Sequence, residues 1–200
     1  MPNRLLFLGR DFNKDDVLYL RDDFKGDVHP YAALTYCWGN GRLARTTKAN
    51  VLERCHGTSH VSLPKTLQDA VVVARKLGIR FLWVDCLCIL QDDPEDLAVQ
   101  ISRMPEIYKN ATVTISASRS SNCAEGFLLP HVFSETHYFT PLKLRVRLPD
   151  DVLGTMIAAP RKGNGKHEDP IHTRAWTLQE RQLSPRIVET ASKRQGWYAV

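Results

Sequence analysis

The sequence of 200 residues has no long hydrophobic run. A membrane span requires roughly 20 consecutive apolar residues, and no apolar run here approaches that length. The opening segment MPNRLLFLGRDFNKDD has only a short apolar stretch before charges return, which makes it a poor secretory signal. We therefore expect no membrane association and a cytoplasmic location. Internal repeats and low-complexity segments are also absent, and one domain accounts for a chain of this length.

Cysteine is scarce and unevenly spaced, with five residues in all: Cys37, Cys55, Cys86, Cys88 and Cys123. An odd count without a secretory signal favours reduced thiols in the cytosol. Cys86 and Cys88 form a C-x-C pair with no second cysteine pair nearby, so zinc is only weakly indicated.

Other groups of metal-ligating residues are equally sparse. One candidate group lies around a glycine-rich loop without matching ligands elsewhere, and solvated side chains explain it better. Its members are His167, Glu168, Asp169 and His172. We expect no bound metal.

Acidic residues are outnumbered by basic ones, 22 to 27, which gives a formal charge of +5 and a pI of about 9.0. This balance favours anionic ligands, but the bases are scattered and no nucleic-acid recognition motif accompanies them. Nucleic acid is therefore not an expected partner. Hydrophobic residues at 43% and charged residues at 24% are typical of a soluble globular protein.

Two short β-type runs near the N-terminus, Arg4 to Leu8 and Val17 to Leu20, are separated by polar residues. They predict a small β-hairpin within residues 1–30. The later patterns predict strands over 31–38, 81–85, 111–118, 142–148 and 186–189, and helices over 47–55, 64–76, 93–108 and 173–183. The run over 142–148 alternates strictly, as a half-exposed edge strand does.

Two of the predicted helices carry clear boundary signals. Pro64 fits a first helical turn, apolar residues follow at helical spacing, and Gly78 is well placed to end the helix. In the other helix Asp93 is the expected N-cap. Pro105 lies inside that helix and should kink it or end its regular part.

Strands and helices alternate through the centre of the chain, which indicates an α/β domain. The segment FLWVD (Phe81 to Asp85) is a nearly continuous apolar run, as in a strand buried on both faces. We therefore predict a mainly parallel central sheet flanked by helices. The strands over 31–38, 81–85 and 111–117 should be adjacent and parallel.

Ligands of open α/β sheets gather beyond the carboxyl ends of the strands, and polar or aromatic residues follow the predicted strands here. The expected ligand-binding residues are Tyr36, Trp38 and Gly39 after the first central strand, Asp85 and Cys86 after the second, and Ser116 at the end of the third. The structural alternative has Trp38 packed in the core and Asp85 capping a turn. Together these residues mark the rim as the best candidate site.

A second candidate group lies in the segment from His172 to Glu180. Trp176 and Glu180 are four residues apart and share one face of the predicted helix. A carboxylate beside an indole has its pKa raised by desolvation and can act as a base or stabilise a cation. The alternative is an ordinary exposed glutamate, paired with Arg181 or Lys193.

Cys86 offers a further enzymatic interpretation, as the nucleophile of a cysteine-dependent hydrolase. Its neighbours are an aspartate and apolar residues, which raise the pKa of a thiol rather than lower it. This is the weakest of the interpretations.

Three segments, in this order, resemble the fungal heterokaryon incompatibility (HET) domain: YAALTYCWGN, LPKTLQDAVVVARKLGIRFLWVDCLCILQDDPEDLAVQISRMPEIYKNATVTISAS and TRAWTLQERQLSPRIV. The match runs from Tyr31 to Val188, so we expect the HET domain over residues 31–190. Residues 191–200 are expected to form a divergent tail. The family usually continues there with an aromatic strand and a W-E-C-like segment, from which ETASKRQGWYAV departs.

The resemblance implies a cytoplasmic domain of non-self recognition that triggers programmed cell death, often at the start of longer proteins with NTPase and repeat regions. Its expected partners are an incompatibility protein or NTPase-type receptor and further copies of itself. HET domains are also distantly similar to TIR domains, which have a parallel flavodoxin-like sheet and some of which hydrolyse NAD. That likeness makes Glu180 the expected catalytic residue, with no cofactor and with NAD as the candidate substrate.

In such a reaction the N-glycosidic bond to nicotinamide breaks through an oxocarbenium-like state, which Glu180 stabilises. Trp38 or Trp176 would stack on a base, and Arg174 would meet a phosphate. The non-enzymatic alternative is a signalling module that acts by self-association or partner recruitment. Both interpretations predict the same fold, so the sequence does not separate them.

Overall fold

The computed structural model describes residues 1–9, 16–24, 27–39, 44–128, 142–147, 153–158, 169–191 and 195–199. The chain divides into two compact units, one formed by Met1–Leu128 with Glu168–Val200 and the other by Leu129–His167. In the second unit, β7 (Leu142–Arg147) pairs antiparallel with β8 (Leu153–Ala158). The strand predicted over 142–148 is therefore present, as half of a hairpin.

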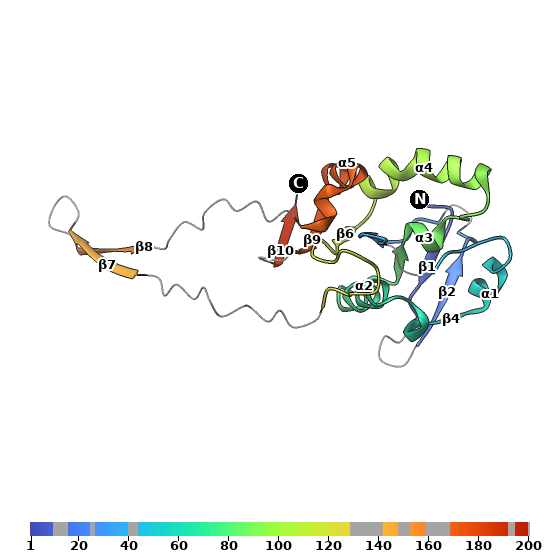
Figure 1. The fold of residues 1–200 in the computed structure, drawn as a ribbon, viewed down its shortest axis with the longest axis horizontal. Coiled ribbons are helices and arrows are strands. Elements are labelled where there is room, and N and C mark those ends of the chain that lie inside the picture. The colour runs from blue at the N-terminus through green and yellow to red at the C-terminus, as the bar shows by residue number, and fades with distance from the viewer. Residues whose placement is uncertain are drawn as a thin grey trace. The chain divides into compact units, whose positions relative to one another are not determined.

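The first unit is built around an eight-stranded mixed sheet (Figure 1). In their order across the sheet the strands are β10 (Gln195–Ala199), β9 (Arg186–Thr190), β6 (Val113–Ser116), β3 (Tyr31–Thr35), β5 (Phe81–Trp83), β1 (Leu5–Phe7), β2 (Val17–Arg21) and β4 (Thr58–Ser59). The junctions β9–β6, β6–β3 and β3–β5 are parallel. The other four junctions are antiparallel.

The three central strands lie as predicted, because β3 runs parallel to both of its neighbours, β5 and β6. The prediction of a mainly parallel sheet is wrong, since antiparallel junctions outnumber parallel ones. The cause lies at the two edges: β1 pairs directly with β5, β4 extends β2, and β10 folds back on β9. Strands as short as β1, with three residues, form by pairing with an existing edge, and a local pattern does not reveal which edge.

Strands from each of the ranges 1–30, 31–190 and 191–200 take part in this one sheet. The predicted N-terminal hairpin is present as β1 and β2, and part of the expected tail forms β10. As a division into domains, those three ranges stay a prediction.

The helices of the first unit are α1 (Val51–His56), α2 (Lys65–Lys76), α3 (Asp85–Cys88), α4 (Pro94–Lys109) and α5 (Ala175–Leu183), with 3₁₀ turns η1 (His60–Ser62) and η4 (Pro170–Thr173). α4 begins where expected, because the Asp93 carboxylate accepts a hydrogen bond from the N–H of Glu95 at 3.1 Å. It continues through Pro105 to Lys109, so Pro105 does not end it. In the part of the chain that the structure describes, no helix is long and apolar enough to cross a membrane.

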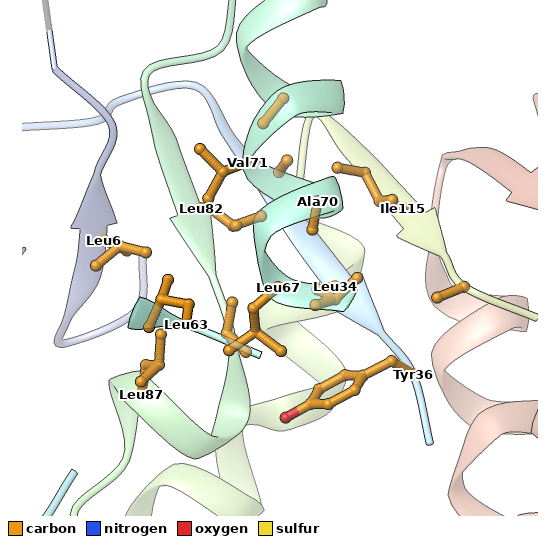
Figure 2. Packing of buried hydrophobic residues seen from close by; sticks show 14 of the residues in the cluster. Leu6, Leu34, Tyr36, Leu63, Leu67, Ala70, Val71, Leu82, Leu87 and Ile115 are labelled. Carbon is orange, nitrogen blue, oxygen red and sulfur yellow. The ribbon is translucent and has the colours of Figure 1, made fainter. Parts of the chain in front are cut away.

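Helices cover both faces of the sheet, and β3 at its centre is buried along its whole length. Its side chains alternate between two hydrophobic clusters. Leu34 belongs to the cluster that contains Leu67 and Val71 of α2 (Figure 2). On the opposite face Ala33 belongs to a cluster with Tyr108 of α4. The apolar residues at helical spacing in the helix predicted over 64–76 therefore face the sheet.

The buried carboxylate of Asp69 joins α2 to the segment that leads into the second unit. Its Oδ2 accepts the N–H groups of Phe127 at 2.7 Å and Leu128 at 2.9 Å, and its Oδ1 lies 2.8 Å from Lys65 Nζ. Gly126, with a φ of 72°, passes so close that an added Cβ would lie 2.7 Å from Oδ2. Burial opposes the charge, but Lys65 and the two N–H groups outweigh burial and hold the pKa of Asp69 below its ordinary range.

We expect Asp69→Ala to destabilise the chain by about 3 kcal/mol at neutral pH, because it leaves two N–H donors without their acceptor. A carboxyl group whose pKa is lowered by folding stabilises the fold at pH values above its ordinary pKa of 3.8. That contribution is lost as the pH falls through the pKa of the folded state. Urea unfolding should therefore show a smaller difference between variant and native chain as the pH falls toward about 3. An equal difference at both pH values would contradict an anchoring role for the Asp69 charge.

Candidate functional site

A cavity of about 200 Å³ lies beyond the carboxyl ends of β3 and β5. Four residues singled out from the sequence line it: Trp38, Asp85, Arg174 and Glu180. Trp38 follows β3, Asp85 begins α3, Arg174 precedes α5, and Glu180 lies within α5. The other lining residues come mainly from α4, which lies beside α5 (Figure 1), and are Ile89, Gln91, Leu97, Ile101 and Met104. Apolar walls with a few convergent polar groups are typical of a ligand site.

The indole of Trp38 is held in place by Asp85. Its Nε1–H donates to Asp85 Oδ2 at 2.8 Å, while Asp85 Oδ1 accepts the N–H of Cys86 at 2.7 Å. The guanidinium of Arg45 lies over the indole, with Cζ at 5.8 Å from the ring centroid. Trp38 also packs against the α2-side core while it lines the cavity. The structural and functional interpretations of Trp38 are therefore compatible.

Glu180 is buried, with 6% of its surface exposed. Its Oε2 accepts a hydrogen bond from the hydroxyl of Thr35, the last residue of β3, while the hydroxyl of the nearby Tyr108 donates to the backbone carbonyl of Leu34 at 3.1 Å. The alternative of an exposed glutamate paired with Arg181 is wrong, because Arg181 Nη1 lies 3.2 Å from Glu189 Oε1 instead. The other suggested partner, Lys193, lies outside the described residues.

Burial raises the pKa of Glu180 above its ordinary value, and the nearby Asp85 adds to that increase. Thr35 and Arg174 act in the opposite direction, because a hydrogen bond and a positive charge both favour the carboxylate. The pKa of Asp85 is raised by burial as well, against the N–H groups of Cys86 and Trp38. Two acids with raised pKa values in one cavity are the kind of pair found at functional sites.

Arg174 supplies the positive charge of the cavity. Its Nη1 donates to the backbone carbonyl of Tyr36, which fixes the guanidinium beside the end of β3. From there its positive charge opposes the increase that burial causes in the pKa values of Asp85 and Glu180. An arginine held in this way can also meet an anionic group of a ligand.

Tyr36 and Cys86 do not line this cavity, although both were expected to bind a ligand. They belong to the buried cluster on the α2 face. Strand alternation explains this for Tyr36, because it lies two residues after Leu34 and shares its face. Burial raises the pKa of the Cys86 thiol well above its ordinary value, with Asp85 adding to the effect, so Cys86 is not a poised nucleophile.

Gly39 has a structural role that accounts for its missing side chain. Its φ is 66°, and an added Cβ would lie 2.2 Å from the Cβ of Asn122. The nearby N–H of Cys123 donates to the carbonyl of Trp38 at 3.3 Å, which holds the two segments together. A glycine is required there by the close approach of the chain.

Ser116 belongs to a second polar cluster, centred on the buried carboxylate of Glu189. Its hydroxyl lies 2.8 Å from that of Ser118, which donates to Glu189 Oε1 at 3.0 Å. Arg181 of α5 reaches the same oxygen, and His172 Nε2 lies 4.0 Å from it. The adjoining void of about 10 Å³ has room for no ligand, so this cluster fastens α5 to β9.

The backbone of Trp176 lies in α5, but its side chain lies outside the described part of the chain. Thr35, Tyr108 and Gln91 were not singled out from the sequence. Alternation along β3 could have identified Thr35, because it shares a face with Ala33, opposite Tyr36. Tyr108 ends the helix predicted over 93–108, and its hydroxyl gave no separate signal.

The described residues contain no group of three or more histidine, cysteine or acidic side chains arranged to hold a metal ion. Of the glycine-rich-loop group, His167 and Glu168 lie outside those residues, and His172 approaches Glu189. All five cysteines are free thiols.

The chain is similar to known fungal proteins. The family model described as heterokaryon incompatibility protein (HET) matches residues 31–180. A curated relative, heterokaryon incompatibility protein 6, OR allele, from Neurospora crassa, is 32% identical over 88 residues. That match covers 40% of this chain and 13% of the relative, so the chain spans a small part of the relative's length. No solved structure matches the chain.

The matched range begins at the first residue of β3 and ends at Glu180. It therefore contains the parallel strands β3, β5 and β6 and all four predicted residues around the cavity. Since this range covers well over half of the sequence, the chain belongs to the heterokaryon incompatibility (HET) family.

Proposed function

We infer that this HET domain acts in heterokaryon incompatibility, by cleaving NAD or a related nucleotide with Glu180 and so triggering cell death. The family and the name of the curated relative support the role in incompatibility. The observation that carries the chemical proposal is the buried Glu180 carboxyl group, held by Thr35 in a cavity that also contains Arg174 and Trp38.

The order of the parallel strands supports a flavodoxin-like and TIR-like origin. Numbered along the chain, β3, β5, β6 and β9 stand in the order 2-1-3-4 across the sheet, as the first four strands of a flavodoxin-like sheet do. In such sheets ligands bind where the strand order reverses, at the carboxyl ends of strands one and three. These strands are β3 and β6 here, and Thr35 at the end of β3 bonds to Glu180.

The proposed reaction breaks the C1′–N bond between ribose and nicotinamide. The bonding electron pair moves to the pyridinium nitrogen, and positive charge develops on the ribose. The ionised Glu180 carboxylate stabilises that charge because it lies in a site largely closed to water. Water then adds to C1′ and releases a proton, so the products are nicotinamide, ADP-ribose and H⁺.

The dimensions of the cavity fit part of the substrate. Its volume of about 200 Å³ is below the roughly 300–1,000 Å³ of sites that enclose a whole drug-sized ligand. A ribose and its attached ring would therefore enter, with the ring against Trp38. The phosphates would remain near the mouth, where Arg174 could bind one oxygen.

The test is direct: the purified chain is incubated with NAD, and the products are separated by chromatography. We expect nicotinamide and ADP-ribose in equal amounts, at a rate proportional to protein concentration. A folded chain that forms neither product at any concentration would overturn the chemical proposal.

The non-enzymatic alternative, a module that self-associates or recruits an incompatibility protein or NTPase-type receptor, has its own support. Apolar side chains are exposed on the two helices beside the cavity: Leu178 of α5 at 65%, and Val99 and Ile101 of α4 at 48% and 45%. Exposed apolar groups of this kind suit a contact with another protein. Cell death at constant NAD, rising steeply with protein concentration, would favour this function.

A further inference from the structure

A second cavity, of about 640 Å³, lies at the opposite end of the parallel strands from Glu180. Phe81, the first residue of β5, pairs with Tyr31, the first residue of β3, so this cavity adjoins the amino ends of both strands. The proposed NAD chemistry uses none of its residues. Its volume is that of a site for one small ligand.

The walls of this cavity are aromatic. The ring of Phe81 has three aromatic neighbours, with centroids at 5.4 Å for Phe7, 5.6 Å for Phe24 and 5.0 Å for His29. All four rings are partly exposed, and all four line the cavity. They come from β1, β5 and the loop before β3, so the fold gathers them from three places. Partly exposed rings around an open space present edges and faces to which a planar ligand can stack.

The charged residues that line the cavity in the described part of the chain are Arg21, Asp23 and Arg80. Arg21 lies 2.7 Å from the Asp23 carboxylate, and these two exposed charges offset each other. Arg80 is also exposed, and no hydrogen bond or ion pair joins its side chain to another residue in the described ranges. Among the residues that the structure describes, Arg80 therefore has no ion-pair partner beside the rings.

The turn before β5 forms part of the cavity wall. Gly78 lines it with a φ of 73°, and an added Cβ would meet nothing within 4 Å. The positive φ favours glycine there, and no atom of the described residues lies within 4 Å of the position a Cβ would take. A ligand can therefore approach the backbone of this turn.

We propose that this cavity binds a planar aromatic ring that carries an anionic group, such as a nucleoside monophosphate. The base stacks against the rings of Phe24 and Phe81, and the phosphate pairs with Arg80. Stacking on aromatic side chains together with an arginine–phosphate bond is a common way to hold a nucleotide. The site is separate from the Glu180 cavity and does not depend on the chemistry proposed there.

The test uses three probes, AMP, adenosine and ribose 5-phosphate, measured by calorimetry against four variants of the full chain. Arg80→Ala should weaken AMP binding at least about tenfold, the scale for losing one charge-assisted hydrogen bond, and leave adenosine unchanged. Phe24→Leu should weaken both AMP and adenosine and leave ribose 5-phosphate unchanged. Lys76→Ala, which removes a neighbouring exposed cation outside the cavity, is the matched control and should bind as the native chain does.

Glu180→Gln separates the two cavities and should leave AMP binding intact. The proposal is overturned if the native chain does not bind AMP, if Arg80→Ala binds it as tightly as Lys76→Ala does, or if Glu180→Gln abolishes binding. If Phe24→Leu has a clearly lower Tm than the native chain, the proposal is tested by Arg80→Ala alone, through its binding of AMP compared with adenosine.

Discussion

Glu180→Gln should leave the chain folded and lower NAD cleavage at least about a hundredfold, the usual scale for one key catalytic group. Glutamine keeps the size of the side chain and an oxygen that can accept the Thr35 hydroxyl, so the cavity keeps its shape. It lacks the negative charge that stabilises the ribose cation. Cell killing in a fungal host should fall with the cleavage rate.

The same substitution should also change how stability depends on pH. Burial raises the pKa of Glu180 in the folded state above the ordinary 4.5. At pH values between 4.5 and the folded-state pKa, the folded state therefore binds more protons than the unfolded state. The native chain therefore loses stability as the pH rises through that window. Glu180→Gln removes the loss and should be at least as stable as the native chain at neutral pH.

A matched control is available on the neighbouring helix. Glu106 of α4 is exposed, and Glu106→Gln makes the same chemical change outside the cavity. It should alter neither the cleavage rate nor the pH dependence of melting. If Glu180→Gln and Glu106→Gln cleave NAD equally well, Glu180 is not the catalytic group.

Val71→Asp should destabilise the chain by at least about 3 kcal/mol and lower the Tm by about 10 °C. Val71 has no exposed surface and lies in the cluster where α2 meets the sheet (Figure 2). A carboxylate there loses its hydration without gaining a partner. Lys76→Asp, at an exposed position of the same helix, serves as the control and should change the Tm far less. Equal melting of the two variants in a thermal scan would contradict the packing of this face.

Much of the fold follows from local patterns in the sequence. The apolar runs of β3, β5 and β6 and the periodicity of α2 and α4 predict these elements, because each pattern reports burial within one segment. The edges of the sheet do not follow in this way. β1 and β10 are stabilised by neighbours far along the chain, and their own residues do not specify which strand they will join.

The sequence predicted which residues lie at the ends of the strands, but not which of their side chains point into the cavity. Trp38 and Asp85 stand beyond strand ends, and Glu180 shares a helix with Arg181, yet only Glu180 faces the cavity. The partner of Glu180, Thr35, is 145 residues away, which no local pattern reports. Ser116 lies opposite Thr35 in the register of β6 and β3, but its hydroxyl joins the Glu189 cluster instead. Proximity at a strand end thus did not ensure a place in the same cavity.

The division of the chain into two units affects when the Glu180 cavity can first exist. Trp38 and Asp85 precede the second unit in sequence, whereas Arg174 and Glu180 follow it. A ribosome adds residues in order, at about 5–20 per second. A nascent chain therefore emerges with one half of the cavity, and β6 lacks its neighbour β9 until α5 and β9 have been made. Whatever the cavity does to a living cell, it cannot form before the ribosome has added Glu180.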